Sequence, residues 1–376
     1  MPSEFDPIPD DRVSRAPQKG RGTMTQVPHR FHAWEREAAL EGEADWPAFP
    51  DDGSPGAKVA TTVTLEQARS ILSRNTSPDI PFDQSVNPYR GCEHGCIYCY
   101  ARPTHSYLNL SPGLDFETRL VAKTNAAALL RQELAKPGYQ PSPINVGSAT
   151  DPYQPIEREH RLTRAVLEVL LGCRHPFTVI TKSSGIERDL DLLAEAARQS
   201  LVYATISITT LDEALCRKLE PRAAAPFRRL QTVRKLAQAG VPVGVNIAPI
   251  IPFLNEPEIE RIVEAAAQAG AQSVHYTVLR LPWEVKPLFE EWLSHHVPER
   301  AARIMARLRE MRGGKDYDAD FSLRMKGEGI WAQLIAQRMR KAAARHGLGR
   351  RAAMLDMSRF DRSALHAPDE TQGELF

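Results

Sequence analysis

Apolar residues recur with two alternating patterns between residues 125 and 312. Stretches in which they return every three or four positions predict helices, and short apolar runs between them predict buried strands. The predicted helices cover residues 125–134, 162–171, 189–198, 227–239, 256–269, 283–294 and 299–312. The predicted strands cover residues 144–147, 177–182, 202–209, 241–251 and 273–279. Gly240 and Gly270 directly follow two of the helices, where a left-handed residue commonly ends a helix.

The alternation of strand and helix predicts an α/β fold. Strands that are separated by a helix pair in parallel through right-handed crossovers. In α/β barrels, ligands bind at the carboxyl ends of the strands. The polar residues that follow each strand are therefore the first candidates for a functional site.

The remaining segments differ from this core in their patterning. Residues 1–57 are rich in Pro, Gly, Asp and Arg, so we expect them to be mostly disordered, with one short helix over 30–42. Residues 58–84 are expected to hold a lead-in helix at 64–72. The core spans residues 85–300, a basic helical C-terminal extension spans 301–351, and a flexible tail spans 352–376.

Composition narrows the class of protein. The chain has 376 residues, of which 25% are charged and 42% hydrophobic, and its formal net charge is +1. These values are typical of a globular protein without a strong overall field. There is no apolar run of about 18 residues, and the N-terminus lacks a signal-peptide layout, so we expect no membrane partner and a cytoplasmic location.

Charge is uneven along the chain. Residues 300–351 contain 14 Lys and Arg against 5 Asp and Glu, a local excess of +9. Such a run attracts phosphates, or it forms the solvated face of a helix. The sequence leaves both interpretations open.

Three cysteines carry the strongest chemical signal. Cys92, Cys96 and Cys99 form a C-x3-C-x2-C array, and three thiolates on one short loop can hold three corners of a 4Fe-4S cluster. The fourth iron then lacks a protein ligand and can bind something else. A zinc site would need a fourth ligand, for which His94 is a candidate, and a disulfide framework is the other alternative. Cys173 and Cys216 stand alone on apolar segments and are expected in the core.

This array resembles the signature of the radical S-adenosylmethionine (SAM) superfamily. Cys96-Ile97-Tyr98-Cys99-Tyr100 is most similar to the spore photoproduct lyase-like (DNA repair photolyase-like) branch, which carries tyrosines on both sides of the last cysteine. The resemblance covers about residues 85–300 and implies a partial (β/α)6 TIM-type barrel, with the cysteine loop after its first strand. It places Tyr98 near the adenine of SAM, and it implies that Tyr98 and Tyr100 are candidate catalytic residues that relay a hydrogen atom or an electron.

The same resemblance assigns SAM-binding roles to residues near the strand ends. Ser148 and Thr150 are expected to contact the methionine moiety, although this segment also reads as a structural turn. Lys182 is expected to meet the methionine carboxylate, unless it is a solvated surface lysine. A further set is expected around the ribose and adenine, with solvated helix charges and ordinary core packing as the alternatives: Ser207, Glu220, Arg229 and Ile250. Arg280 follows the last strand and could bind a phosphate or carboxylate of the substrate.

The implied function is a radical SAM enzyme that uses a 4Fe-4S cluster and SAM. In the family, one electron from a donor such as flavodoxin or ferredoxin cleaves SAM, and the resulting 5′-deoxyadenosyl radical abstracts a hydrogen atom from a substrate. The lyase proper uses a cysteine near the second-strand motif as a hydrogen donor, and this chain has none between Cys99 and Cys173. We therefore expect a different outcome, with nucleic acid as one candidate substrate. A small metabolite or peptide substrate, and a non-catalytic iron–sulfur or zinc module, are the alternatives.

Overall fold

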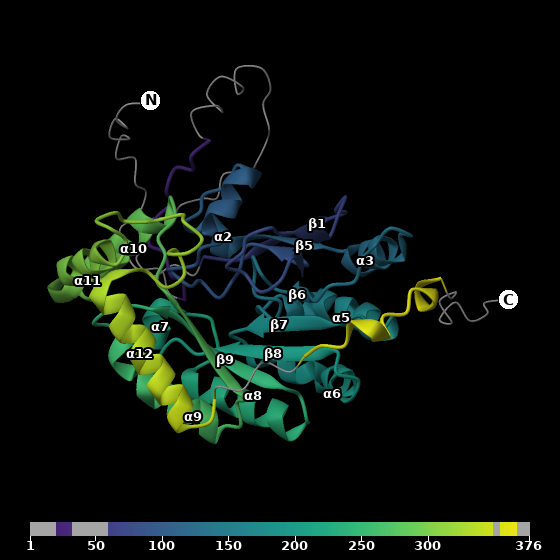
Figure 1. Ribbon diagram of the computed structural model, residues 1–376. Coiled ribbons are helices and arrows are strands. Elements are labelled where there is room, and N and C mark those ends of the chain that lie inside the picture. Colours follow the sequence, from purple (N-terminus) through teal and green to yellow (C-terminus); the bar gives the residue numbers. More distant parts are fainter. Residues whose placement is uncertain (1–19, 32–58, 349–353, 367–376) are drawn as a thin grey trace, which may run out of the picture.

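The computed structural model describes residues 20–31, 59–348 and 354–366 (Figure 1). Its centre is a seven-stranded sheet in the order β10-β9-β8-β7-β6-β3-β2. Six of these strands are parallel, and β2 pairs antiparallel with β3 at one edge. The seven strands are β2 (Leu72–Arg74), β3 (Gln84–Val86), β6 (Ile144–Val146), β7 (Phe177–Thr181), β8 (Val202–Ser207), β9 (Val243–Ile250) and β10 (Ser273–Val278).

Helices connect the parallel strands and cover the outer face of the sheet (Figure 1). The crossover helices are α3 (Ala126–Ala135), α4 (Glu157–His160), α5 (Leu162–Gly172), α6 (Leu190–Arg198), α7 (Glu213–Leu219), α8 (Pro226–Gln238) and α9 (Ile259–Gln268). Six parallel strands with these crossovers form the predicted partial barrel. The α/β prediction is confirmed, and the five strands predicted from the apolar runs correspond to β6–β10.

The core lies between the sheet and this helical layer. Leu130 and Val166 from the helices, and Val146, Ile206 and Val245 from the strands, are completely buried. Removing this much apolar surface from water is the dominant stabilising contribution in a fold of this kind. The alternation of β-branched strands with amphipathic helices therefore produces the layered architecture directly.

The region before the barrel is wrongly predicted as a helix. Instead of a helix at 64–72, the chain forms β1 (Thr62–Glu66), and β1 pairs in parallel with β5 (Arg119–Lys123). With β4 (Tyr89–Arg90), these strands make a separate three-stranded sheet. The β-branched run Thr62-Val63-Thr64 favours a strand, and long-range pairing with β5 overrides the local helical spacing. Leu65, which the helix would have used in its apolar face, is 62% exposed.

Two segments predicted to lack order pack against the barrel. Within the predicted disordered segment, residues 21–25 are buried, and Arg21 donates to the backbone oxygens of Glu117 (2.8 Å) and Val59 (2.7 Å). Within the predicted tail, Asp361 N donates to the oxygen of Cys173 (2.8 Å), and the Phe360 ring lies 5.1 Å from that of His175. The prediction of disorder is therefore wrong for residues 20–31, and the prediction of a flexible tail is wrong for residues 354–366. All but residues 30 and 31 of the helix expected over 30–42 lie outside the described residues.

The C-terminal extension is helical. It contains α11 (Pro298–Glu310) and α12 (Gly329–Arg345), preceded by α10 (Val285–His296). Figure 1 shows α12 beside α9, and Arg338 of α12 binds Glu260 of α9 with an oxygen–nitrogen distance of 2.7 Å. The remaining helices are α2 (Asp115–Thr118) and the short 3-10 helices η1 (Arg102–Leu108), η2 (Ser184–Asp189), η3 (Glu256–Glu258), η4 (Met357–Arg359) and η5 (Ser363–Leu365). In the described part of the chain, no helix is both long and apolar enough to cross a membrane.

Candidate cofactor site at the strand ends

The three clustered cysteines lie on the loop that leaves the first parallel strand, β3. Cys92 and Cys96 are buried, Cys99 is partly buried, and all three are free thiols. Gly91 and Gly95 bracket the start of this loop with φ angles of 74° and 65°, which favour glycine. A Cβ on Gly91 would lie 2.6 Å from Leu120 and 2.8 Å from the Phe116 oxygen, so the loop is tightly seated.

A buried ion pair holds the loop from below. The Arg102 side chain, which is fully buried, donates to the Cys96 backbone oxygen (2.9 Å) and to Glu117 (2.5 Å). Glu117 in turn accepts from the backbone N–H of Gly22 (2.9 Å) in the N-terminal segment. A buried pair is tolerated when further hydrogen bonds satisfy both charges, as they do here. The N-terminal segment is therefore tied to the floor of the cysteine loop.

The loop that follows β6 holds the cysteine loop from the other side. Thr150 donates its hydroxyl to the Gly91 oxygen (2.7 Å), and Gln154 donates to the same oxygen (3.2 Å). The Ser148 hydroxyl accepts from the Asn87 amide (3.1 Å). The predicted residues Ser148 and Thr150 thus lie beside the cysteine loop, and the contacts that they make in the structure are with the protein. Direct contact of either with SAM stays a prediction.

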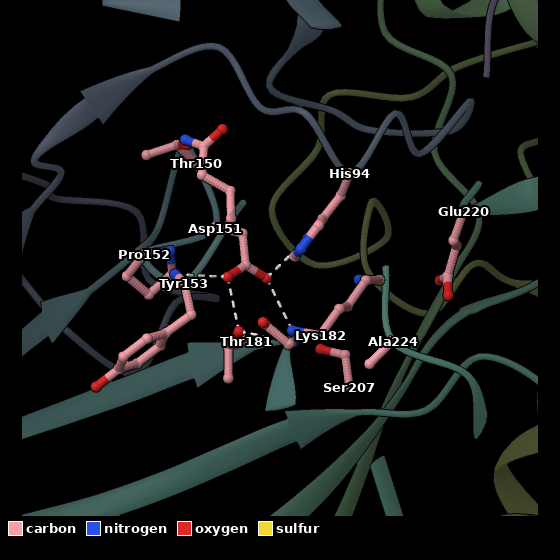
Figure 2. Close-up of polar contacts among 12 residues, drawn as sticks. His94, Thr150, Asp151, Pro152, Tyr153, Thr181, Lys182, Ser207, Glu220 and Ala224 are labelled. Carbon is pink, nitrogen blue, oxygen red and sulfur yellow. Dashed lines mark hydrogen bonds and ion pairs between the residues drawn. The ribbon is translucent and has the colours of Figure 1, made fainter. Parts of the chain in front are cut away.

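Asp151 connects the cysteine loop to the end of β7 (Figure 2). Its carboxylate accepts from the Thr181 hydroxyl (2.6 Å) and from the Lys182 backbone N–H (2.8 Å). It also lies 3.2 Å from Nδ1 of His94. Burial favours the neutral form of both groups, but the attraction between their opposite charges outweighs burial. The pKa of Asp151 therefore falls to about 2. The pKa of His94 rises to about 10, and Cys92 contributes to this rise. His94 is therefore engaged with Asp151, which weakens the zinc interpretation.

A second buried ion pair lies across the strand ends. Glu220 and Arg229 are both 1% exposed and are directly bonded. Glu220 also accepts from the hydroxyls of Tyr98 and Thr209. Arg229 donates in addition to the backbone oxygens of Ala224 (2.7 Å) and of Ser207 (3.0 Å). The structure thus brings Tyr98, Ser207, Glu220 and Arg229 together, and their roles toward SAM stay predictions.

This network is anionic at Glu220 and cationic at Arg229. Burial raises the pKa of Glu220, but Arg229 and Lys182 outweigh that effect and lower the pKa to about 2. The Cys216 thiol donates to Glu220 at 3.6 Å. Cys216, which the sequence places in the core, is buried, and it borders the candidate site.

Lys182 lies between the two networks (Figure 2). Its ammonium is 5.7 Å from the centre of the Tyr98 ring. Burial lowers its pKa, but Cys96 and Glu220 outweigh burial, so the net shift is upward and the side chain is cationic. Within residues 20–31, 59–348 and 354–366, no carboxylate lies within ion-pair distance of this ammonium. A partly buried cation that no carboxylate bonds directly is suited to an anionic ligand.

The outer rim of the site contains the second predicted tyrosine. Tyr100 is 51% exposed and donates its hydroxyl to the Ser148 backbone oxygen. The guanidinium of Arg280, which follows β10, lies 4.9 Å from the centre of the Tyr100 ring. Ile250, at the end of β9, is completely buried, which fits core packing as well as the predicted adenine contact.

The donor set fits a cluster held at three corners. Three free thiols share one rigid loop, and burial raises the pKa of Cys96 while the neighbouring Lys182 ammonium opposes that rise. Because ligation requires the thiolate, a nearby cation favours it. Cys173 donates to the Leu170 oxygen (3.6 Å) beneath α5 rather than lying beside the loop.

Several residues that organise the site were missed from the sequence. Sequence patterns assign no functional contact to Asp151, Gln154 or the Arg102–Glu117 pair. The segment Asp151-Pro152-Tyr153-Gln154-Pro155 directly after a buried strand was the available signal, because two prolines fix a turn that presents polar side chains. The contacts of Arg102 and Glu117 are tertiary contacts, and no local sequence pattern predicts them.

Comparison with known proteins places this geometry in a family. The sequence matches the radical SAM superfamily over residues 86–266, which contain the cysteine loop and the strands β6–β9. An uncharacterised protein of Mycobacterium tuberculosis is 37% identical over 254 residues, 66% of this chain and 74% of that protein. A radical SAM Nalpha-GlyT isomerase of Pseudomonas phage M6 is 23% identical over 61% of this chain and 46% of that protein.

A solved structure shares the fold. Spore photoproduct lyase, as a mutant with bound AdoMet and dinucleoside spore photoproduct, superposes with a TM-score of 0.53. The match covers 76% of this chain and 79% of the lyase, at 16% identity. Both the sequence match over the cysteine loop and the shared barrel lead to the same assignment. The chain belongs to the radical SAM superfamily.

Proposed function

We propose that this protein is a radical SAM enzyme that abstracts a hydrogen atom from a nucleotide in a nucleic acid. The observation that carries the first part is the position of Lys182, a partly buried cation without an ion-pair partner among the described residues, next to a loop of three free thiols. When bound, a 4Fe-4S cluster and SAM supply a 5′-deoxyadenosyl radical by one-electron cleavage of the sulfonium.

The residues of the chain would bind and orient this pair of cofactors. Cys92, Cys96 and Cys99 would hold three irons and leave the fourth for the amino acid moiety of SAM. Lys182 would donate to the methionine carboxylate, since a charge-assisted bond compensates for its burial.

The rest of the predicted contacts follow the order of the strands. Ser148 would meet the methionine amino group from the β6 loop, and Ser207 at the end of β8 would meet the ribose. Tyr98 and Ile250 would enclose the adenine. The Glu220–Arg229 pair fixes the Tyr98 hydroxyl and the Ser207 backbone, so it would position these contacts rather than make them.

Support for a nucleic-acid substrate comes from the rim of the site. Arg280 has no carboxylate partner among the described residues, and its guanidinium covers the exposed ring of Tyr100. A cation beside an aromatic ring is the combination that binds a phosphate and an adjacent base. The lyase with the same fold has been solved with a dinucleoside photoproduct, which fits this substrate class.

The basic C-terminal extension gives less support. Much of its charge is used within the protein: Arg309 binds Asp316 (2.6 Å), Arg324 binds Asp79 (2.6 Å) and Lys315 binds Asp318 (3.1 Å). Paired charges on a surface contribute little to attracting a polyanion. The substrate proposal therefore rests on Arg280 and Tyr100.

The test of the cofactor chemistry starts from anaerobically reconstituted protein. Dithionite and SAM should yield 5′-deoxyadenosine, and adding SAM should change the electron paramagnetic resonance spectrum of the reduced cluster. Cys99→Ser should abolish both signals. Cys173→Ser, a buried cysteine away from the loop, is the matched control and should retain them. If the electron paramagnetic resonance spectrum of the reduced cluster is the same with and without SAM, the proposal is contradicted.

The substrate is tested by isotope transfer. DNA and RNA oligonucleotides deuterated at carbon are supplied in turn, and deuterium in 5′-deoxyadenosine is measured by mass spectrometry. Transfer from either polymer supports the proposal, and Arg280→Met should reduce that transfer without reducing the SAM cleavage that occurs in the absence of substrate. Deoxyadenosine formation without deuterium from either polymer would refute the nucleic-acid substrate while leaving the SAM chemistry intact.

A further inference from the structure

A basic depression lies beside the cysteine loop. Its volume is about 320 Å³. Its lining comes from the N-terminal segment, from α7 and the turn after it, and from the end of α10, and includes Arg21, Gly22, Arg217, Lys218, Pro221 and His296. We refer to these six residues as the α7 surface.

The α7 surface is cationic. Arg217 and Lys218 are exposed, and the lining contains no acidic side chain. Arg217 pairs with Glu213 of the same helix at 3.7 Å, and both side chains are exposed. Burial and the charge of Arg222 lower the pKa of Arg21 and outweigh the opposing charges of Glu117 and Glu93.

This surface is in direct contact with the cysteine loop. The backbone oxygen of Leu219, the residue after Lys218, accepts from the N–H of Ile97 at 3.1 Å. A Cβ on Gly22 would lie 1.7 Å from the Gly95 oxygen, so the N-terminal segment touches the loop without an intervening side chain. One layer of backbone therefore separates the α7 surface from the segment that carries Cys96.

An electron carrier cannot dock at the barrel mouth during turnover. SAM and substrate would occupy the strand ends, where Lys182 and Arg280 lie. A protein that delivers electrons during turnover has to approach the cysteine loop from a side that remains open. The backbone contact with Ile97 makes the α7 surface such an approach.

We propose that the α7 surface docks an acidic one-electron carrier, a flavodoxin, which reduces the cluster. This proposal rests on the proposed function. The anionic reduced flavin gives up one electron to the oxidised cluster, with no proton transferred and no bond formed or broken. Complementary charge accelerates such encounters and makes them sensitive to salt, as expected for a transient redox complex.

The test compares two electron sources. Arg217→Glu/Lys218→Glu reverses the charge of the α7 surface, and Arg340→Glu/Lys341→Glu reverses a matched exposed Arg-Lys pair on α12. SAM cleavage by each variant is measured with dithionite and with flavodoxin reduced by its NADPH-dependent reductase. We expect the α7 variant to lose about tenfold or more of the flavodoxin-driven rate, because electrostatic steering contributes at least that factor. Its dithionite-driven rate and the control variant should match the wild type.

The outcomes separate the two proposals. Equal flavodoxin-driven rates in the α7 variant and the control would overturn the docking site. Loss of the dithionite-driven rate in the wild type would instead contradict the proposed function. In that case, binding of flavodoxin to the reconstituted protein is measured at low salt. If Arg217→Glu/Lys218→Glu removes binding and the control variant retains it, the docking site is supported. If the α7 variant binds flavodoxin as the wild type does, the docking site is overturned.

Discussion

Replacing Lys182 by methionine separates a ligand-binding cation from a structural one. The Lys182 ammonium lies above the Tyr98 ring and has no carboxylate within ion-pair distance among the described residues. Its stem leaves β7 beside Asp151, which binds the Lys182 backbone N–H rather than the side chain. Lys182→Met therefore preserves the Asp151 network and most of the packing volume, and it removes only the charge.

The expected loss of SAM affinity follows from the kind of bond removed. A hydrogen bond to a charged group contributes about 1.5–3 kcal/mol. Since each 1.4 kcal/mol corresponds to about a factor of ten, the dissociation constant for SAM should rise by about 10- to 150-fold. The stability of the protein without SAM should change by less than about 1 kcal/mol, because no directly bonded carboxylate would lose its partner.

Isothermal titration of the reconstituted protein with SAM measures the first quantity, and urea unfolding measures the second. Lys235→Met is the matched control, since Lys235 is half exposed and binds Glu187 (2.6 Å) at the surface. A Lys182→Met protein that binds SAM as tightly as wild type would refute the assignment. So would a large loss of stability, because it would show that Lys182 has a structural partner.

Three further predictions concern the frame around the cofactors. Arg229→Met should lower the free energy of unfolding by about 3–5 kcal/mol, because it leaves the buried carboxylate of Glu220 unpaired; Arg228→Met, which removes a surface pair, should cost at most about 1 kcal/mol in the same urea titration. Because the pKa of Glu220 is depressed to about 2, its charge stabilises the fold above its unfolded pKa of about 4.3, and this contribution is lost as the pH falls toward 2. Urea titrations at several pH values should therefore show the stability gap between wild type and Glu220→Gln narrowing below about pH 4; a constant gap would contradict the ionised state of Glu220. Gly91→Ala should reduce iron incorporation severalfold on reconstitution, since its Cβ would meet Leu120 and the Phe116 backbone, whereas Gly138→Ala faces open space and should incorporate iron normally.

The barrel could be predicted because its signals are local. Each of the strands β6–β10 is an apolar run bounded by turn residues, and each crossover helix has its own apolar stripe. The cysteine loop is local as well, since its three thiols lie within eight residues of sequence. The helix predicted at 64–72 was wrong because the signal that determines this segment is not local. Strand β1 exists because it pairs with β5, 57 positions later, and that partner is not visible from residues 62–66.

In the candidate site, too, the residues with a local sequence signal were predicted and the long-range contacts were not. Tyr98, Lys182 and Glu220 were predicted, because each follows a recognisable strand or motif and a resemblance supplies its role. The contacts that orient them were not predicted: Asp151 reaches His94 across 57 residues of sequence, and Arg102 binds Glu117 beneath the loop. Such pairs depend on how the loops pack, which neither spacing nor periodicity encodes.

The charges at the strand ends distinguish an enzyme from an inert iron–sulfur module. Asp151 is neutralised by His94, and Glu220 is neutralised by Arg229. Of the described cations that the site contains at its strand ends, Lys182 and Arg280 have no carboxylate within ion-pair distance.

Each of these cations lies over one of the two tyrosines that flank Cys99, at 5.7 Å from the Tyr98 ring and 4.9 Å from the Tyr100 ring. A ring face stabilises a cation by only about 0.5–2 kcal/mol, and both side chains are partly buried, so each would gain from binding an anion. A protein that only held a cluster would have no use for two such residues. Their positions are explained if one meets the carboxylate of a bound cofactor and the other meets an anionic substrate that enters above it.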